Sequence, residues 1–177
     1  LEKTNWGKQV RIVAPNDQDY FEGMSPDFRV RAIVGYAASD LLMAALHDVR
    51  PCEKEQGVSQ QIYDRYFSKL LELLSSRTAS SLLSALSELP NGMFGISELL
   101  SRAANDFRLA KDFSKRLPTV SIVGEIYVRQ EPYANNFIVK KLEERGLRVI
   151  AAPFTEWLEY TTFCEIQRMK EGRHQDG

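Results

Sequence analysis

The chain has 177 residues, and its 23 basic and 24 acidic side chains leave a formal net charge of −1. This length suits one well-filled domain, and the balanced, interleaved charges exclude the basic stripe that is typical of nucleic-acid binding. No run approaches the roughly 18 to 20 apolar residues of a membrane span, so we expect neither a nucleic-acid nor a membrane partner.

The two cysteines, Cys52 and Cys164, lie far apart in the sequence, and neither has a second ligand at metal-binding spacing. A disulfide framework or a self-contained metal site would need more such residues. We therefore expect reduced thiols, a cytoplasmic location and no metal site within the chain. Cys164, on the apolar side of the last expected helix, is interpreted as a small core residue.

The first part of the chain is expected to be one strand followed by helices. Residues 10–14 are a short β-branched run before a Pro-Asn-Asp turn, which predicts a strand. Apolar residues then recur at helical spacing, with Ser59 as the expected cap of the second helix. The predicted helices cover residues 31–50, 59–74, 75–89 and 96–116. Because such a run of consecutive helices exceeds an ordinary crossover, residues 30–117 are predicted to be a helical insertion or annex beside a sheet.

The last third is predicted to be a strand, helix, strand, helix unit over residues 118–170. Gly146 stands where a helix commonly ends on a left-handed residue, and Thr155 is the expected cap of the last helix. The strands are predicted at 119–124 and 147–151, with a helix at 136–145 between them. Two parallel strands joined by a helix require a right-handed crossover. We therefore expect an α/β fold, a Rossmann-like parallel sheet flanked by helices, with the helical insertion between its first and second strands.

Residues 1–177 are expected to form a single α/β domain. The chain begins with Leu1, and no signal-peptide pattern follows it, so we interpret it as a segment excised from a larger protein.

The candidate ligand site is the long connection at residues 124–136, since ligands gather beyond the carboxyl ends of parallel strands. Gly124 would allow a close backbone approach, and Arg129 could hold a phosphate or carboxylate with two hydrogen bonds. The remaining candidates in this connection are Glu125, Tyr127, Tyr133, Asn135 and Asn136. The structural alternative is that Asn135 only caps a helix and that Arg129 pairs with Glu125 or Glu131.

A second polar patch is predicted at Arg50 and Glu53, although a helix-exit turn explains these charges almost as well. His47 lies near the end of a predicted helix, where a cationic imidazole would favour the helix dipole. Neither GxGxxG nor GxxxxGK[ST] occurs in the chain, so any ATP used by a parent protein is expected to bind elsewhere.

Residues 120–160, VSIVGEIYVRQEPYANNFIVKKLEERGLRVIAAPFTEWLEY, resemble CoA-substrate-specific enzyme activases of the DUF2229 type, and residues 29–57 are similar to the same proteins. These large bacterial proteins are related to the components of 2-hydroxyglutaryl-CoA dehydratase and to benzoyl-CoA reductase. The positions that match the recurrent residues of the family are Arg50, Glu53, Gly124, Glu125, Tyr127, Arg129, Pro132, Asn135 and Asn136. Cys52 stands where an aromatic residue is expected, which argues against a cluster ligand at this position.

The resemblance implies a non-ATPase module that supports ATP-dependent, low-potential electron transfer to a CoA-thioester enzyme. The isolated module is expected not to be catalytic and to hold no cofactor, with ATP and a [4Fe-4S] cluster in the parent protein or its partner. Its partners would be the other domains of that polypeptide, and a CoA-thioester substrate or a dehydratase. The alternatives are a small-ligand module for CoA or a phosphate-bearing cofactor, and an interdomain scaffold marked by an exposed apolar patch.

Overall fold

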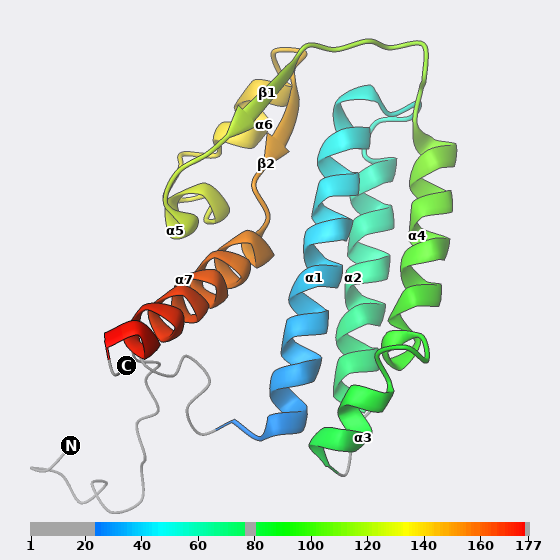
Figure 1. Cartoon of the computed structure of the whole chain (residues 1–177). Helices are drawn as coiled ribbons and strands as arrows, with labels where there is room; N and C mark the ends of the chain where they lie inside the picture. Colours follow the sequence, from blue (N-terminus) through cyan, green and yellow to red (C-terminus); the bar gives the residue numbers. More distant parts are fainter. Residues whose placement is uncertain (1–23, 77–80, 176–177) are drawn as a thin grey trace, which may run out of the picture.

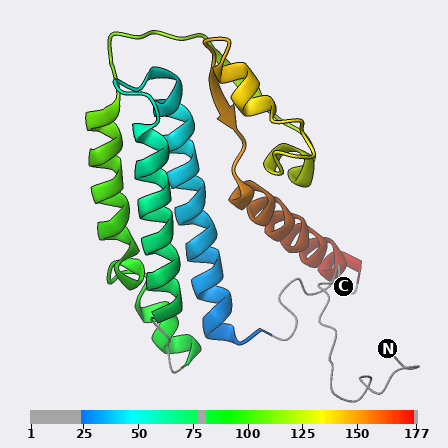
Figure 2. The ribbon, with the colours of Figure 1, turned by 180° about the vertical axis from the view of Figure 1, so that it is seen from behind.

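The computed structural model of the chain describes residues 24–76 and 81–175, with side chains described up to residue 171. The fold is mixed α/β, with a helical bundle followed by a small parallel sheet and a long C-terminal helix (Figure 1). The strand expected at residues 10–14 lies outside the described residues. The view from behind shows the bundle on one side and the sheet unit on the other, joined by an extended connection (Figure 2).

The bundle consists of three long helices and several short ones. The long helices are α1 (Pro26–Val49), α2 (Val58–Ser76) and α4 (Ile96–Ala110), and the short ones are α3 (Leu82–Ser87), η1 (Arg50–Cys52) and η2 (Met93–Gly95). The helical spacing of apolar residues predicted the long helices because that spacing forms one stripe per helix. These stripes meet in a single core, whose most buried members include Ala38, Leu42, Leu46, Leu70, Ile96, Ala103 and Phe107.

Helix α4 is shorter than the sequence predicted, since it ends at Ala110 and not at residue 116. The backbone N–H of Lys54 donates to the carbonyl of Ala110 at 2.9 Å, and Glu53 forms an isolated antiparallel bridge with Lys111. The turn after η1 therefore provides backbone partners that stop the helix one residue before Lys111.

One helical segment, Pro26–Cys52, is long and apolar enough to cross a membrane by length and composition alone. In the fold, the stripe formed by Val34, Ala38, Leu42 and Leu46 of this segment is buried in the bundle core. Packing in the core accounts for this stripe, whereas Ile33, Tyr36 and Leu41 of the same helix are exposed.

The sheet unit contains the two strands β1 (Thr119–Ile122) and β2 (Arg148–Ala151), which pair in parallel with Val120 opposite Val149. Between them lie α5 (Ile126–Gln130) and α6 (Ile138–Glu143), and α7 (Phe154–Gln175) follows β2. The predicted parallel pair joined by a helix is confirmed, as is the left-handed conformation of Gly146, whose φ is +77°. The described part of the sheet has two strands.

The connection from β1 to α6 differs from the prediction. The first strand ends at Ile122 and not at residue 124, and the expected polar loop contains the short helix α5. Helix α6 begins two residues later than predicted because Asn136 and Phe137 adopt left-handed conformations, with φ of 56° and 55°. The backbone N–H of Phe137 donates to the carbonyl of Pro132 at 2.7 Å, which holds this turn closed.

Helix α1 belongs to both parts of the molecule and runs antiparallel to β2. Asp48, near the end of α1, bonds Arg148 at the start of β2, whereas Asp40, farther back, bonds Phe154 just beyond the end of β2. This polarity is that of a helix packed along a strand in an α/β unit.

The N-terminus of α7 is capped by Asp40, and not by Thr155 as the sequence suggested. The Asp40 carboxylate accepts the backbone N–H groups of Phe154 at 2.9 Å and Thr155 at 2.8 Å, and also the Thr155 hydroxyl at 2.7 Å. We expect Asp40→Ala to lower the free energy of unfolding by about 1 to 2 kcal/mol, since it removes the cap and the charge at the helix N-terminus. Urea unfolding measures this loss.

The matched control for Asp40 is the exposed Asp64 of α2, whose carboxylate bonds the amide of Gln60. Asp64→Ala should change the free energy of unfolding by less than about 0.5 kcal/mol. Equal effects of the two substitutions would contradict a capping role for Asp40.

Candidate functional site

The connection at residues 124–136 leaves the carboxyl end of β1, as the sequence predicted. Gly124 has a φ of +134°, a conformation that favours glycine. Glu125 caps α5, because its Oε2 accepts the backbone N–H of Val128 at 2.9 Å. Hydrogen bonds from the backbone of Val128 and Tyr127 hold the pKa of Glu125 below its usual range. The Glu125 carboxylate is therefore bound to the first turn of its own helix.

Arg129 is buried, with only 8% of its side chain exposed, and it joins the connection to the start of α7. One terminal nitrogen donates to the carbonyl of Pro153 at 3.1 Å. The other lies 3.5 Å from the carbonyl oxygen of Gly124 and 3.7 Å from a carboxylate oxygen of Glu156. The acidic partner is thus Glu156, whereas the sequence suggested Glu125 or Glu131. The guanidinium cross-links the backbone at the carboxyl ends of both strands.

The two asparagines differ in their roles. The Asn135 side chain accepts the N–H of Ile138 at 3.2 Å and donates to the carbonyl of Arg129 at 3.3 Å, so it secures the start of α6. Asn136 supplies one of the two left-handed residues of the turn. Tyr127 and Tyr133, by contrast, are largely exposed, and 84% of Tyr133 is accessible to solvent.

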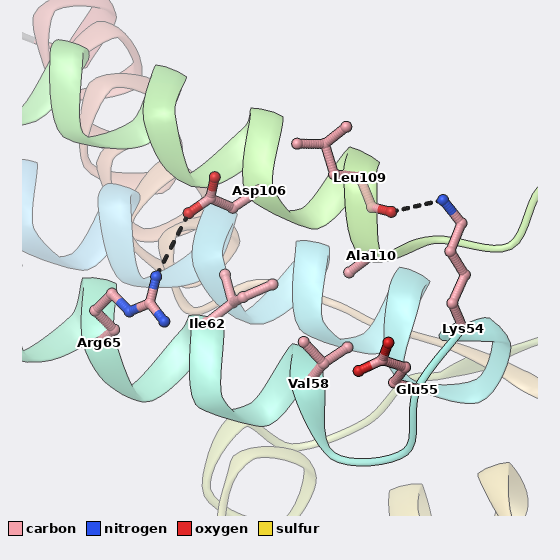
Figure 3. Close-up of a pocket in the computed structure, with 8 residues that line it drawn as sticks. All are labelled: Lys54, Glu55, Val58, Ile62, Arg65, Asp106, Leu109 and Ala110. Carbon is pink, nitrogen blue, oxygen red and sulfur yellow. Dashed lines mark hydrogen bonds and ion pairs between the residues drawn. The ribbon is translucent and has the colours of Figure 1, made fainter.

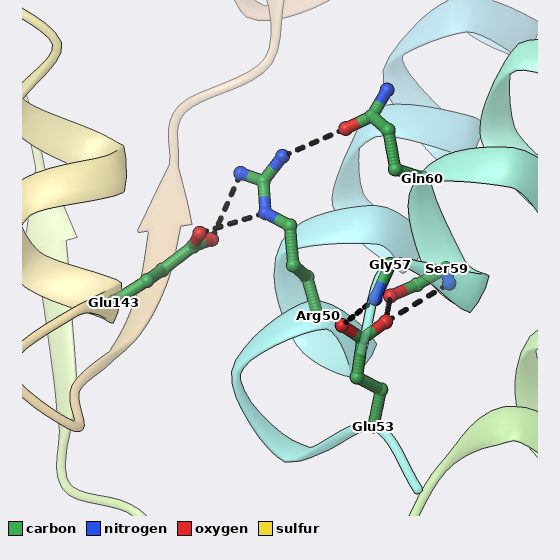
Figure 4. Close-up of polar contacts among 6 residues, drawn as sticks. All are labelled: Arg50, Glu53, Gly57, Ser59, Gln60 and Glu143. Atoms are coloured by element: carbon green, nitrogen blue, oxygen red, sulfur yellow. Dashed lines mark hydrogen bonds and ion pairs between the residues drawn. The ribbon is translucent and has the colours of Figure 1, made fainter. Parts of the chain in front are cut away.

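Glu53, a member of the second predicted patch, caps α2 (Figure 4). Its carboxylate accepts the backbone N–H groups of Gly57 and Ser59, the latter at 2.9 Å, and the hydroxyl of Ser59. Ser59 itself was the expected cap, but it is buried inside the first turn and donates to Glu53. The helix-exit interpretation of this patch therefore accounts for Glu53.

Arg50, the other member of the patch, reaches across to the sheet unit. Its Nε lies 2.7 Å from Oε2 of Glu143 and a terminal nitrogen lies 3.0 Å from Oε1, while the other terminal nitrogen bonds Gln60 at 3.1 Å (Figure 4). Only 7% of the Glu143 side chain is exposed. The structure thus joins Arg50 to α6 through Glu143, rather than placing it beside Arg129 in one pocket.

Sequence reasoning missed a second polar link between bundle and sheet. Asp48 of α1 pairs with Arg148 of β2 at 2.9 Å and also with Lys111. Arg148 in turn donates to the Thr119 hydroxyl on the neighbouring strand at 2.9 Å and 3.1 Å. Residues 48 and 148 are 100 positions apart, and no local pattern connects them.

His47 is buried, contrary to the expectation of a cationic helix end. Burial, and secondarily the charge of Arg50, lower the pKa of His47 to about 4. The imidazole is therefore neutral near pH 7 and does not interact with the helix dipole as a cation.

A shallow groove of about 390 Å³ lies between α2 and α4 (Figure 3). Val58 and Ile62 line its floor, and its two cations have partners within the groove: Lys54 donates to the Leu109 carbonyl at 2.8 Å, and Arg65 lies 3.8 Å from Asp106. None of the candidate site residues lines this groove.

Several large apolar side chains in β2 and in the connection from β1 to β2 are exposed. We call them the exposed apolar set: Val123, Tyr127, Val128, Tyr133, Phe137 and Ile150. None of the four residues of β1 is buried. Parallel strands normally have both faces covered.

Among the side chains of residues 24–76 and 81–171, no group of three or more His, Cys, Asp or Glu could hold a metal ion. Cys52 is buried, its thiol lies 3.2 Å from the carbonyl of Asp48, and burial raises its pKa. A thiol in this environment is a poor metal ligand because the thiolate is the binding form.

Comparison of the chain with models of protein families, with curated proteins and with solved structures found no match.

Proposed function

We propose that this chain is a non-ATPase module of an acyl-CoA dehydratase activase or dehydratase-like protein, which supports ATP-dependent, low-potential electron transfer to a CoA-thioester enzyme. Its role in that assembly is docking: the sheet unit presents the exposed apolar set to another domain of the same polypeptide or to a dehydratase partner. The chain itself carries out no chemistry.

The observation that carries this proposal is the solvent exposure of the parallel sheet. Strand β1 has no buried residue, and the neighbouring strand β2 exposes Ile150. The two strands therefore leave apolar surface in water, whereas parallel sheets normally have both faces covered. The polar residues of the same region point to the same role. Arg129, Asn135 and Glu125 bond the backbone around them, which leaves few free polar groups for a small ligand.

The proposal includes a larger sheet, of which β1 and β2 are two strands. A two-stranded parallel sheet is smaller than the sheets that normally form an α/β layer. In the complete protein, further strands extend β1 and β2 into a Rossmann-like sheet flanked by helices, with the bundle as its helical annex. The predicted strand at residues 10–14 is one candidate for such an extension.

The cofactors of the proposed assembly lie outside this module. The chain has two cysteines, fewer than the four that commonly hold a [4Fe-4S] cluster, which supports placing the cluster ligands in another domain or in the partner. ATP is bound by a separate ATPase module, in keeping with the absence of both common phosphate-loop patterns from the sequence.

The second candidate function is the binding of CoA or another phosphate-bearing cofactor at Arg129. The position of Arg129 favours it, between the glycine turn after β1 and the start of α7. Calorimetry of the chain with CoA, acetyl-CoA and ATP separates the two functions. Docking predicts no heat of binding, whereas a micromolar affinity that Arg129→Ala abolishes would support the cofactor site and overturn the docking role.

Docking is tested directly by changing two members of the exposed apolar set, Val123→Asp and Tyr133→Ser, in the complete protein. We expect ATP-dependent electron transfer to the CoA-thioester enzyme to fall at least tenfold, because a charge or a lost ring at a packed interface removes apolar burial. The melting temperature of the chain alone should change little, since both side chains are exposed.

Leu83→Ser is the matched control, since Leu83 of α3 is equally exposed but lies outside the sheet unit. Electron transfer should stay within twofold of the unmodified protein in this variant. Unchanged transfer in the Val123 and Tyr133 variants would exclude this surface from docking.

A further inference from the structure

The imidazole of His47 makes no hydrogen bond with the described residues. Only 9% of the residue is exposed, and its nitrogens are not among the fully buried polar atoms that lack a partner, so they face solvent-accessible space. A neutral imidazole carries one N–H donor and one acceptor nitrogen. Both remain available to a ligand.

His47 lines a cavity of about 130 Å³ between α1 and β2. The other lining residues are Ala44, Asp48, Arg148, Val149, Ile150 and Ala151. Ala44 and Ile150 are exposed, so the cavity opens to solvent at its rim. This volume suits a molecule of a few heavy atoms and excludes a nucleotide or CoA.

Arg148 lines the same cavity and has donors that the described residues leave unused. A guanidinium has five N–H donors, and the Arg148 group uses three of them, two toward Thr119 and one toward Asp48. One N–H remains on each terminal nitrogen. Planar guanidinium groups recognise carboxylates through such paired donors.

The ion pairs made by Asp48 and Arg50, which are the charged neighbours of His47 along the chain, leave a positive excess. Arg148 of β2, Lys111 of the connection after α4 and Arg50 of η1 are cations, whereas Asp48 of α1 and Glu143 of α6 are anions. Three positive and two negative charges leave one positive charge. A monoanion would neutralise the cluster, whereas a dianion would overcompensate it.

We propose that this cavity binds a small monocarboxylate of the size of formate or acetate, held by the imidazole N–H of His47 and the two remaining N–H donors of Arg148. The site shares Ile150, at its rim, with the exposed apolar set, whereas Val123 and Tyr133, the residues changed to test docking, do not line it. Binding is linked to proton uptake, since a bound anion stabilises the imidazolium form of His47.

The chain is well suited to a direct test because it contains only two histidines, His47 and His174. Histidine ring resonances are followed by NMR at pH 6 during titration with sodium acetate, with sodium chloride at equal ionic strength as the reference. We expect the His47 resonances to shift and saturate at millimolar acetate, and those of His174 to remain unchanged. Saturating acetate should also raise the titration midpoint of His47.

Two variants examine the proposed contacts. Arg148→Gln should weaken acetate binding at least tenfold, whereas Arg145→Gln, which removes a cation that bonds only the Lys141 carbonyl, should leave it within twofold. Because Arg148→Gln also removes a link to Asp48, a second variant, Ala44→Leu, narrows the cavity from an exposed helix position and should abolish saturation without removing a charge. His47 shifts that are equal in acetate and chloride, or that persist in Ala44→Leu, would overturn the proposal.

Discussion

Replacement of Arg50 by methionine is expected to lower the free energy of unfolding by about 3 kcal/mol, because it leaves the carboxylate of Glu143 buried without its partner. The pair has two short hydrogen bonds, and Glu143 is 7% exposed. Loss of one partner of a buried ion pair is more costly than loss of the pair itself. Urea or thermal unfolding of the two proteins measures the difference.

Two further variants identify the cause of this effect. Adding Glu143→Leu to Arg50→Met should recover at least half of the lost stability, since no unpaired charge remains. Glu98→Gln breaks the exposed pair of Glu98 and Arg102, both 71% exposed, and should cost less than about 0.5 kcal/mol. If Arg50→Met lowered the free energy of unfolding as little as Glu98→Gln, the pair of Arg50 and Glu143 would not stabilise the contact between bundle and sheet.

Acidification is expected to remove about 3 kcal/mol of stability through His47. The pKa of His47 is about 4 in the folded chain, whereas the ordinary pKa of histidine is 6.5, so the unfolded state binds the proton more tightly. The contribution is fully present above about pH 6.5 and is lost as the pH falls to about 4. Free energies of unfolding between pH 7 and pH 4, in a buffer free of carboxylates, test this dependence.

His47→Gln isolates the contribution of this one group. Hydrogen bonds also lower the pKa values of Asp27, Asp112 and Glu125, and these carboxyls add acid sensitivity to both proteins. The difference in the free energy of unfolding between the unmodified chain and His47→Gln should therefore decrease steadily from pH 7 to pH 4. His174→Gln is the control and should leave the pH dependence of the free energy of unfolding unchanged. If this free energy had the same slope against pH in all three proteins, His47 would not be buried as described.

The elements that were predicted correctly have local causes. The apolar stripes of α1, α2 and α4, and the β-branched run of β1, carry their periods within the sequence. Gly146 ends α6 in a left-handed conformation because glycine has no Cβ to clash. The parallel pairing of β1 and β2 followed from their separation by one helical segment, and the position of the candidate connection followed from that pairing.

The features that escaped prediction depend on partners distant in the sequence or on conformations against local preference. Phe137 adopts a left-handed conformation that aromatic residues rarely take, held by the carbonyl of Pro132. Glu143 lies 93 positions from Arg50, and Asp40 lies 115 positions from Thr155. No local pattern identifies such pairs, so the polar residues of the candidate site could be located on the chain but not assigned to their partners.

The attachment of the sheet unit to α1 has a consequence for synthesis of the chain. Translation produces α1 first, and the bundle core needs only residues up to Ala110, so the bundle can assemble on the ribosome before β1 emerges. The partners of Glu143, Arg148 and Thr155, which lie on α1 and η1, are then already fixed in position. The last third of the nascent chain thus folds against a bundle that has already formed. Strand β1, which has no buried residue, emerges late and is therefore exposed during only a short part of translation.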